Sequence, residues 1–163
     1  MSPPRVYWVK CPQIGRLAVV SRPREARNFA EMKAAGIDVL ISLQEAEEAA
    51  SVGLADEAER CREAAITFYS LPILDHGIPS NVEAVATLSA RLRQHLEQGE
   101  GVAAHCYAGL GRSPLMIAAV MIDAGVDSYE ACDLITAARG VGVPEMATQV
   151  DWLLAYEHHR RRQ

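Results

Sequence analysis

Hydrophobic and polar residues follow two different periods along the chain. Short apolar or β-branched runs, each bounded by polar or turn-forming residues, are typical of buried strands. The runs that predict buried strands are Leu17–Val20, Asp38–Ser42, Ile66–Ser70 and Gly101–Cys106, and Arg5–Val9 predicts an additional edge strand.

Between these runs, apolar residues recur every three or four positions, which predicts helices. Helices are expected over residues 24–35, 45–65 and 80–99. Three more are expected: one that begins near Arg112, one that follows the acidic caps Asp127 and Glu130, and one that begins near Glu145. Gly53 is expected to divide the second of these helices, because glycine weakens a helix. Ser80 and Glu83 have the spacing of a capping box at the start of the third.

Strands that alternate with helices favour a mainly parallel sheet, because parallel strands need a long crossover between them. We therefore expect an α/β protein with a central sheet of four or five strands and helices on both faces. No repeat, low-complexity tract or linker interrupts this pattern. Residues 1–163 are accordingly expected to form one domain.

Composition and charge narrow the class of protein further. Half of the 163 residues are hydrophobic and 23% are charged, which fits a soluble globular protein. The net charge of −5 gives the molecule no overall basic field for nucleic acid, and the basic run at residues 158–162 is expected to be a solvated helix end. The longest apolar run, Leu115–Ile122, is too short to span a bilayer.

The cysteines and the first residues indicate the compartment. Cys11, Cys61, Cys106 and Cys132 lie far apart and form no CxxC pair, so a disulfide scaffold is not expected. The opening residues MSPPRVYWVK lack the apolar core of a signal peptide. These features favour a cytoplasmic protein with reduced thiols. We expect a monomer that binds neither nucleic acid nor membrane.

One segment, HCYAGLGRSP at residues 105–114, lies between a predicted strand and a predicted helix. Such a loop presents backbone N–H groups that lack helical partners, and the helix dipole adds positive potential there. Gly109 and Gly111 let the backbone curl around an anion. The segment therefore predicts a phosphate-binding loop at the carboxyl edge of the sheet. The N–H groups expected to face the phosphate belong to Tyr107, Ala108, Gly109, Leu110, Gly111 and Arg112.

Three side chains of this loop suit phosphoryl transfer. The positive potential at a helix N-terminus favours the thiolate form of a cysteine, which is the nucleophilic form, and Cys106 stands there. Arg112 supplies a planar cation that can hold two phosphate oxygens. Ser113 can donate a hydrogen bond to the sulfur and make the thiolate a better leaving group. Thiol, guanidinium and hydroxyl are thus expected to be parts of one site.

These residues form the HCx5R[ST] signature, and the chain resembles the Cys-based protein phosphatases that share it. Within that superfamily it is most similar to the small atypical dual-specificity phosphatases, in particular to the cyclin-dependent-kinase-associated phosphatase type. The similarity continues in GIDVLISLQEAEE, in LPILDHGIPS and in ARGVGVPEMATQVDWL, and it covers roughly residues 14–156. The resemblance implies a protein-tyrosine-phosphatase-like fold and a phosphoric monoester hydrolase.

The resemblance also implies roles for residues outside the loop. Asp75, which stands 31 residues before Cys106, would be the general acid that protonates the leaving group. Gln149 would orient the water of the second step, and His105 would order the loop. His76, next to the expected acid, is expected to be exposed. The resemblance implies no cofactor and no metal, and no residues have the spacing of metal ligands.

The loop interior YAGLG bears on the substrate. It has no lysine, whereas members of the superfamily that favour polyphosphoinositides tend to carry lysines there. The chain also has no tyrosine-bearing recognition loop of the kind that deepens the pocket of large phosphotyrosine-specific enzymes. We therefore expect a shallow pocket for a phosphorylated protein or peptide. Such a pocket would accept phosphotyrosine, and phosphoserine and phosphothreonine are further candidate substrates.

Other interpretations stay open at this point. A pseudo-phosphatase would bind phosphate through the same loop without turnover, and a phosphatase of this type could act on a non-protein phosphomonoester. A sulfurtransferase or arsenate reductase would use the same thiol for different chemistry, although no resolving cysteine is obvious. Cys61 could form a reversible disulfide with Cys106 under oxidation, or could simply be a small buried hydrophobe.

Overall fold

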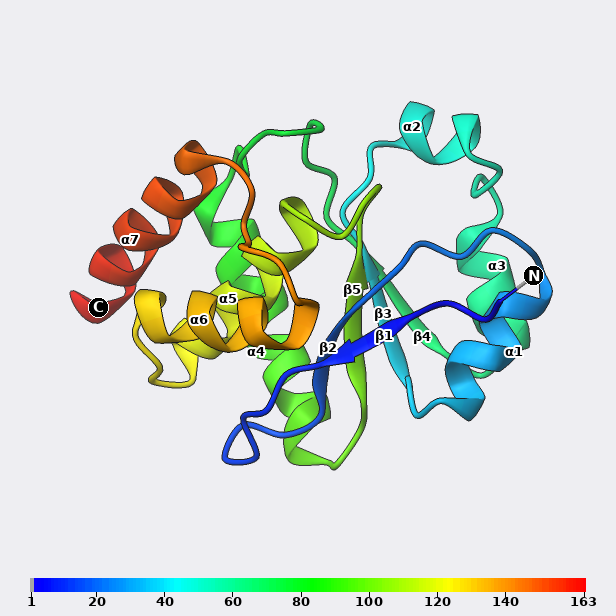
Figure 1. The fold of residues 1–163 in the computed structure, drawn as a ribbon, viewed down its shortest axis with the longest axis horizontal. Coiled ribbons are helices and arrows are strands. Elements are labelled where there is room, and N and C mark those ends of the chain that lie inside the picture. The colour runs from blue at the N-terminus through cyan, green and yellow to red at the C-terminus, as the bar shows by residue number, and fades with distance from the viewer. Residues whose placement is uncertain (1) are drawn as a thin grey trace.

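A five-stranded sheet of order β1-β2-β5-β3-β4 forms the centre of the molecule in the computed structural model, which describes residues 2–163 (Figure 1). The strands are β1 (Val6–Trp8), β2 (Leu17–Val20), β3 (Val39–Ser42), β4 (Thr67–Ser70) and β5 (Val102–His105). β1 is antiparallel to β2, and all other neighbours are parallel. The expected mainly parallel sheet, with an additional edge strand near residues 5–9, is confirmed.

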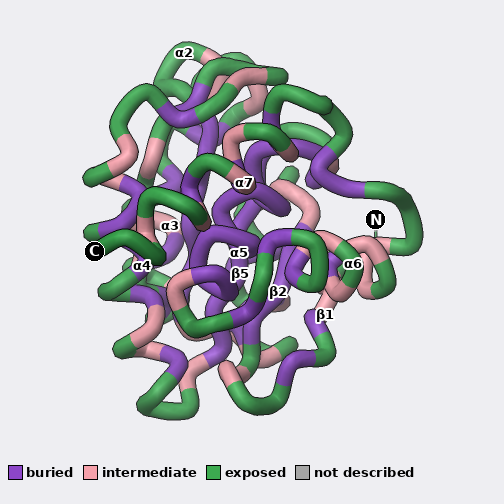
Figure 2. Tube along the Cα trace, turned by 90° about the vertical axis from the view of Figure 1, so that its left-hand side faces the viewer, coloured by how far each residue is buried: buried purple, intermediate pink, exposed green. Residues whose placement is uncertain are grey.

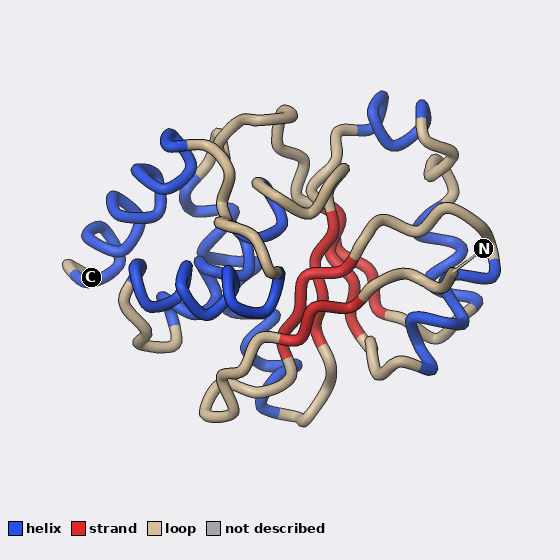
Figure 3. The backbone as a smooth tube through the Cα atoms, viewed as in Figure 1, coloured by secondary structure: helices blue, strands red, loops and turns tan. Residues whose placement is uncertain are grey.

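The described residues form seven helices, and helices pack on both faces of this sheet, which confirms the α/β class (Figure 3). They are α1 (Arg27–Ala34), α2 (Ala46–Ser51), α3 (Glu57–Glu63), α4 (Val82–Glu97), α5 (Arg112–Asp123), α6 (Ser128–Arg139) and α7 (Ala147–Arg161). α1 and α3 lie on one side, and α4 to α7 on the other (Figure 1). Among the described residues, no helix is both long and apolar enough to cross a membrane.

Alternate strand residues supply two separate cores, because successive side chains of a strand point to opposite faces. Ala18 and Ala103 pack with α1 and α3, whereas Val19 and Ala104 pack with the larger cluster around α5. Every residue of α5 from Arg112 to Ile122 is buried, and Figure 2 shows β5 and α5 in the interior. The segment that joins them is therefore fixed at both ends.

Several predicted boundaries need correction. The long helix predicted over residues 45–65 is divided as expected, and Gly53 in the turn has a φ of 79°. The N-cap of α4 is Asn81, whose side chain accepts from the N–H of Ala84, so the prediction of a capping box at Ser80 was wrong. α1 begins at Arg27, three residues after the predicted start at residue 24. The N–H groups of Arg24 and Glu25 donate to the Asn28 side chain there.

Two expectations about exposure were also wrong in part. β4 was predicted to be buried, but it pairs only with β3 at the edge of the sheet, and its residues are exposed or half-buried. The basic run at the end of α7 is not simply solvated. Arg160 pairs with Asp123 at 2.8 Å, and Arg161 donates to backbone carbonyls at the end of α5 and beyond it.

Candidate active site

The cysteine loop connects the carboxyl end of β5 to the N-terminus of α5, as the sequence predicts. Cys106 follows the last strand residue, and its side chain is buried at the base of the loop. Its Sγ lies 3.2 Å from the Oγ of Ser113, in the first turn of α5. The helix therefore brings the thiol, the hydroxyl and the guanidinium of Arg112 to one place.

The backbone of the loop is oriented by contacts on its outer side. Four carbonyl oxygens are held there: Arg22 donates to Tyr107 at 3.0 Å, Arg139 to Ala108 and Gly109 at 3.2 Å each, and the Glu145 N–H to Leu110 at 2.7 Å. Among the described residues 2–163, none accepts a hydrogen bond from the N–H groups of residues 107–112. With the carbonyls tied outward, the N–H groups can serve an anion inside the loop.

Arg112 is the most constrained side chain of the site. It is 2% exposed, and its two terminal nitrogens donate to the carboxylate of Glu48 at 2.6 and 2.8 Å. The same nitrogens donate to the carbonyl of Ile73 at 2.9 Å and to Asp75 at 3.0 Å. Burial acts to lower the pKa of Arg112, but hydrogen bonds to Glu48 and nearby charges outweigh it and raise the pKa.

Glu48, on α2, is a site residue that the sequence analysis did not name. Hydrogen bonding to Arg112 holds the pKa of Glu48 below its ordinary value, against the opposing effect of burial. The sequence did contain a signal for Glu48, because three acidic residues, Glu45, Glu47 and Glu48, follow β3, and β3 lies next to β5 in the sheet. Residues that follow neighbouring parallel strands meet at one edge.

The predicted acid, Asp75, is brought into the site. Its side chain is 51% exposed and contacts Arg112 from the loop that follows β4. His76 is exposed, as predicted, and has a φ of 63°, in the left-handed region. The His76 ring lies 3.7 Å from both Asp75 and Glu145. The sequence analysis did not anticipate Glu145 at this edge.

His105 is fully buried behind the cysteine. Its Nδ1 lies 3.2 Å from the carbonyl of Cys106, and its Nε2 lies 2.5 Å from the carboxylate of Glu57 on α3. Glu57 is itself only 3% exposed. It lies 48 residues before His105 in the sequence, and no spacing pattern connects the two. The pair fixes the ring of His105 and, through it, the start of the loop.

Gln149 is buried, and it links three segments of the site. Its Nε2 donates to the carbonyl of Gly77 at 3.0 Å, and its Oε1 accepts from the N–H of Met146. A Cβ on Gly111 would approach the Gln149 amide to 2.8 Å, so glycine at this position lets the loop and α7 pack closely without displacing that amide. The helix prediction near Glu145 placed Gln149 correctly, although α7 begins at Ala147.

A pocket of about 220 Å³ opens between these segments, and Cys106, Arg112, Asp75, Gln149, Tyr107 and Glu145 line it. Its floor offers unpaired N–H groups and a buried guanidinium, which suit a phosphate dianion. Within the part of the chain that the structure describes, no group of His, Cys, Asp and Glu residues is placed to hold a metal ion.

Cys61 does not share this site. It belongs to the core cluster around α1 and α3, whereas Cys106 belongs to the cluster on the other face of the sheet. Burial, and to a lesser degree Glu57, raises the pKa of Cys61 to about 12, so its thiol is unreactive at neutral pH. The interpretation of Cys61 as a small buried hydrophobe therefore fits better than a disulfide with Cys106.

A comparison of the sequence with known protein families agrees with the geometry of the cysteine loop. Residues 18–126, more than half of the chain, match the sequence profile of the family Tc-R-P, described as "Polymorphic toxin system, DSP-PTPase phosphatase". The chain belongs to this family of DSP-PTPase phosphatases. The resemblance to Cys-based phosphatases drawn from the loop is thereby confirmed.

Individual relatives add detail. The chain is 36% identical over 95 residues to protein tyrosine phosphatase domain-containing protein 1 of Mus musculus, an alignment that covers 53% of this chain and only 12% of that protein. The kinase associated phosphatase (KAP), with its catalytic cysteine replaced by serine, superposes with a TM-score of 0.90 over 100% of this chain and 99% of its own, at 19% identity. Tk-PTP in its active form gives a TM-score of 0.76 at 25% identity, covering 90% and 94%. The fold is therefore that of the protein tyrosine phosphatases.

Proposed function

We propose that this protein is a protein phosphatase that hydrolyses phosphotyrosine, and phosphoserine or phosphothreonine as further substrates, through a phosphocysteine intermediate. One observation carries the proposal. The Cys106 sulfur lies at the base of a pocket whose wall carries Arg112 and Asp75. The N–H groups of its loop have no acceptor among residues 2–163. Nucleophile, anion clamp and proton donor are thus within reach of one phosphoryl group.

In the first step, the loop N–H groups and Arg112 would hold the three non-bridging oxygens of the phosphoryl group. The Cys106 thiolate attacks phosphorus in line with the ester oxygen, so the S–P bond forms as the P–O bond breaks. Asp75 gives its proton to the departing oxygen. Charge that spreads over the phosphoryl oxygens is stabilised by donors that are already in place. Glu48 would keep Arg112 oriented throughout.

In the second step, water attacks the phosphocysteine. Asp75, now a carboxylate, takes a proton from that water, and the S–P bond breaks to give inorganic phosphate. The Ser113 hydroxyl, 3.2 Å from the sulfur, would donate to the departing thiolate. Gln149 lines the same pocket, and its amide would orient the water.

The loop sequence and the exposure of Asp75 favour a protein or peptide substrate. The loop interior, residues 107–111, carries no lysine that would bind a multiply phosphorylated inositol ring. Asp75 is half exposed, so a bulky leaving group can approach it. A non-protein phosphomonoester remains the second candidate.

The test is hydrolysis of para-nitrophenyl phosphate and of phosphotyrosine, phosphoserine and phosphothreonine peptides in the presence of EDTA. We expect turnover by the wild type, none by Cys106→Ser, and a reduction of about 100-fold in kcat for Asp75→Asn. Retained phosphate binding without turnover by the wild type would instead identify a binding module. Turnover of small phosphomonoesters with no peptide hydrolysis would identify a non-protein substrate.

A further inference from the structure

A second hollow lies beside the catalytic loop, on the side of the sheet that carries α1. It has a volume of about 370 Å³ and lies between the segment before β1 and the segment that joins β2 to α1. Its polar lining includes Arg5, Ser21, Arg22, Arg24, Glu25 and Asn28. We call this hollow the arginine groove.

The arginine groove carries an excess of positive charge in an acidic protein. Within the described residues 2–163, Arg5, Arg22 and Arg24 form no ion pair with a carboxylate. The one acid that lines the groove, Glu25, is paired with Arg27 at 2.7 Å. In a chain with a net charge of −5, three arginines without a carboxylate partner that line one hollow form a local anion-attracting site.

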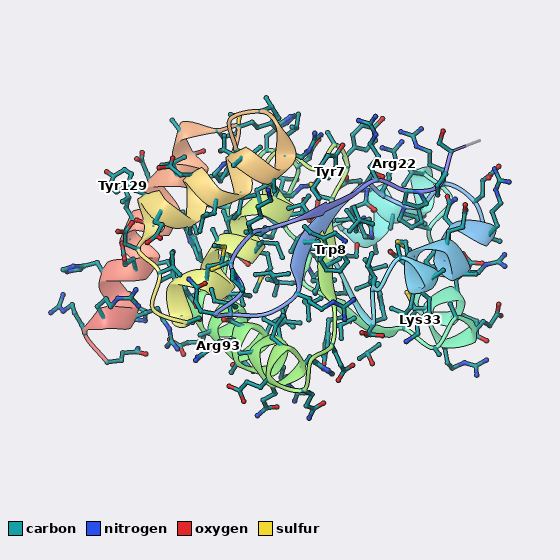
Figure 4. The ribbon with its side chains drawn as sticks, turned by 60° about the horizontal axis from the view of Figure 1, so that its bottom comes forward. Tyr7, Trp8, Arg22, Lys33, Arg93 and Tyr129 are labelled. Carbon is teal, nitrogen blue, oxygen red and sulfur yellow. The ribbon has the colours of Figure 1, made fainter. Side chains whose placement is uncertain are left out.

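Arg22 fixes the position of this groove relative to the active site. It donates to the carbonyl of Tyr107, and its guanidinium lies over the Tyr107 ring, 4.1 Å from the ring centre. Tyr107 is half exposed and lines the catalytic pocket, whereas Arg22 lines the groove, so the contact between these two residues joins the walls of the two hollows. Figure 4 shows Arg22 projecting from the segment between β2 and α1, away from α6 and α7.

The opposite side of the catalytic pocket has the reverse charge. Asp75 and Glu145 line it there, and the segment before α7 lies across the molecule from the segment between β2 and α1 (Figure 1). A bound phosphopeptide would therefore meet acidic residues, the proton donor Asp75 and Glu145, on one side of its phosphorylated residue and arginines on the other. Such asymmetry selects among substrates and sets their direction.

We propose that the arginine groove is a specificity subsite that binds a second anionic group of a phosphopeptide, either a carboxylate or a second phosphate, next to the residue in the catalytic pocket. This inference rests on the proposed function and names the substrate class of the same site. Guanidinium groups suit both anions, because they form paired hydrogen bonds with planar carboxylates and with phosphate oxygens. Arg22 is already immobilised, so less side-chain freedom is lost when an anion binds.

The test measures peptide binding rather than turnover, with Cys106→Ser protein and fluorescence anisotropy. Three peptides share one sequence around phosphotyrosine and carry glutamates, glutamines or a phosphoserine at the flanking positions. We expect the glutamate and phosphoserine peptides to bind about tenfold more tightly than the glutamine peptide at low salt, the range expected for two or three exposed charge contacts. Raising the ionic strength from about 0.02 to about 0.3 M should reduce this preference by screening.

Arg5→Gln together with Arg24→Gln is the decisive variant, because neither side chain contacts the catalytic loop. It should reduce the preference to about twofold, as expected when most of the exposed charge contacts are lost. The control is Arg91→Gln together with Arg162→Gln, which removes the same charge from exposed positions on α4 and at the end of α7. A preference that survives in the groove variant, or falls equally in the control, would overturn the proposal.

Two failures can be told apart. If wild-type protein does not hydrolyse para-nitrophenyl phosphate while the binding preference follows the groove arginines, the proposed catalysis fails and the subsite stands. If turnover is normal but the three peptides bind equally, the subsite fails and the catalysis stands. A preference for phosphoserine over glutamate identifies a second phosphate as the preferred group, and equal affinity identifies any anion.

Discussion

At the scale of single residues, the site depends on carboxylates that hold other side chains in position. Glu48 holds the guanidinium of Arg112 with two hydrogen bonds, and Glu57 holds the imidazole of His105 with one. Both acids lie on helices that follow β3 in the sequence, Glu48 on α2 and Glu57 on α3. Glu57 contacts the last residue of β5, and Glu48 contacts the first residue of α5. Each can be removed without touching a group proposed to react.

Glu48→Gln is expected to reduce kcat/KM about tenfold, because Arg112 loses the paired charge that fixes its fork geometry. The variant should also lose about 2 kcal/mol of unfolding free energy at neutral pH. Glu48 has a lowered pKa in the folded protein, so this stability is present above its ordinary value of 4.5 and is lost as the pH falls through the folded value.

Denaturant unfolding between about pH 3 and pH 7 checks this expectation, since that range spans the titration of a carboxyl group. Glu47→Gln, an exposed neighbour on the same helix, serves as the control and should match the wild type. A stability difference between wild type and Glu48→Gln that does not shrink toward low pH would contradict the assignment.

Glu57→Leu should destabilise the protein by about 2 to 3 kcal/mol, because the buried His105 nitrogen loses its partner. Glu57→Gln keeps a hydrogen-bonding oxygen at that place and should lose less. Unfolding free energies of the two variants, with the exposed Glu63→Gln on the same helix as control, provide the measurement. Equal losses for leucine and glutamine would mean that the hydrogen bond to His105 contributes nothing.

At the scale of elements, the loop is positioned by close packing against α7 as well as by hydrogen bonds. In Gly111→Ala, the new Cβ would meet the Gln149 amide at 2.8 Å, so that amide must move and its bond to the Gly77 carbonyl weakens. Gly111 has a φ of −129°, so no left-handed strain complicates the substitution.

We expect Gly111→Ala to lower kcat about tenfold, because it shifts the segment that carries Asp75. Gly142→Ala is a matched control, since no atom lies within 4 Å of its added Cβ. Steady-state kinetics with para-nitrophenyl phosphate compare the two variants. A Gly111→Ala enzyme with wild-type kcat would show that contact between loop and α7 is not needed for positioning.

The arrangement of the elements also explains which parts of the fold and of the site could be predicted from the sequence. The loop from His105 to Ser113 is contiguous, so its chemistry and its place between strand and helix are readable from local pattern. Glu57 could not be found in this way, because its role depends on how closely α3 approaches β5 in the folded chain. β4 was predicted to be buried because its residues are apolar or β-branched, a property that edge and central strands share. Strand order, which decides between them, is a property of the whole sheet.

At the scale of the whole molecule, some contacts that stabilise the fold lie far from the active site. The far end of α7 is fastened to α5 by Tyr156, whose hydroxyl donates to Asp123 at 2.7 Å. The Tyr156 ring also stacks on Trp152 with ring centres 4.9 Å apart. These contacts are remote from the cysteine loop, which lies at the opposite end of α5.

Tyr156→Phe should therefore lose about 1 kcal/mol of unfolding free energy, the value of one buried hydrogen bond, and keep the wild-type kcat. Chemical denaturation and steady-state assays on the same preparations measure both quantities. Tyr129→Phe, on an exposed position of α6, is the control and should change neither. A loss of kcat in Tyr156→Phe would show that the anchoring of α7 is coupled to the site.

The central claim is that Cys106 carries the phosphoryl group during turnover. Acid quenching of the enzyme within the first turnover, followed by peptide mapping by mass spectrometry, tests it directly. The account predicts one added phosphoryl group on the peptide that contains Cys106, and none in Cys106→Ser. Phosphorylation of a different residue, or continued turnover by Cys106→Ser, would contradict it.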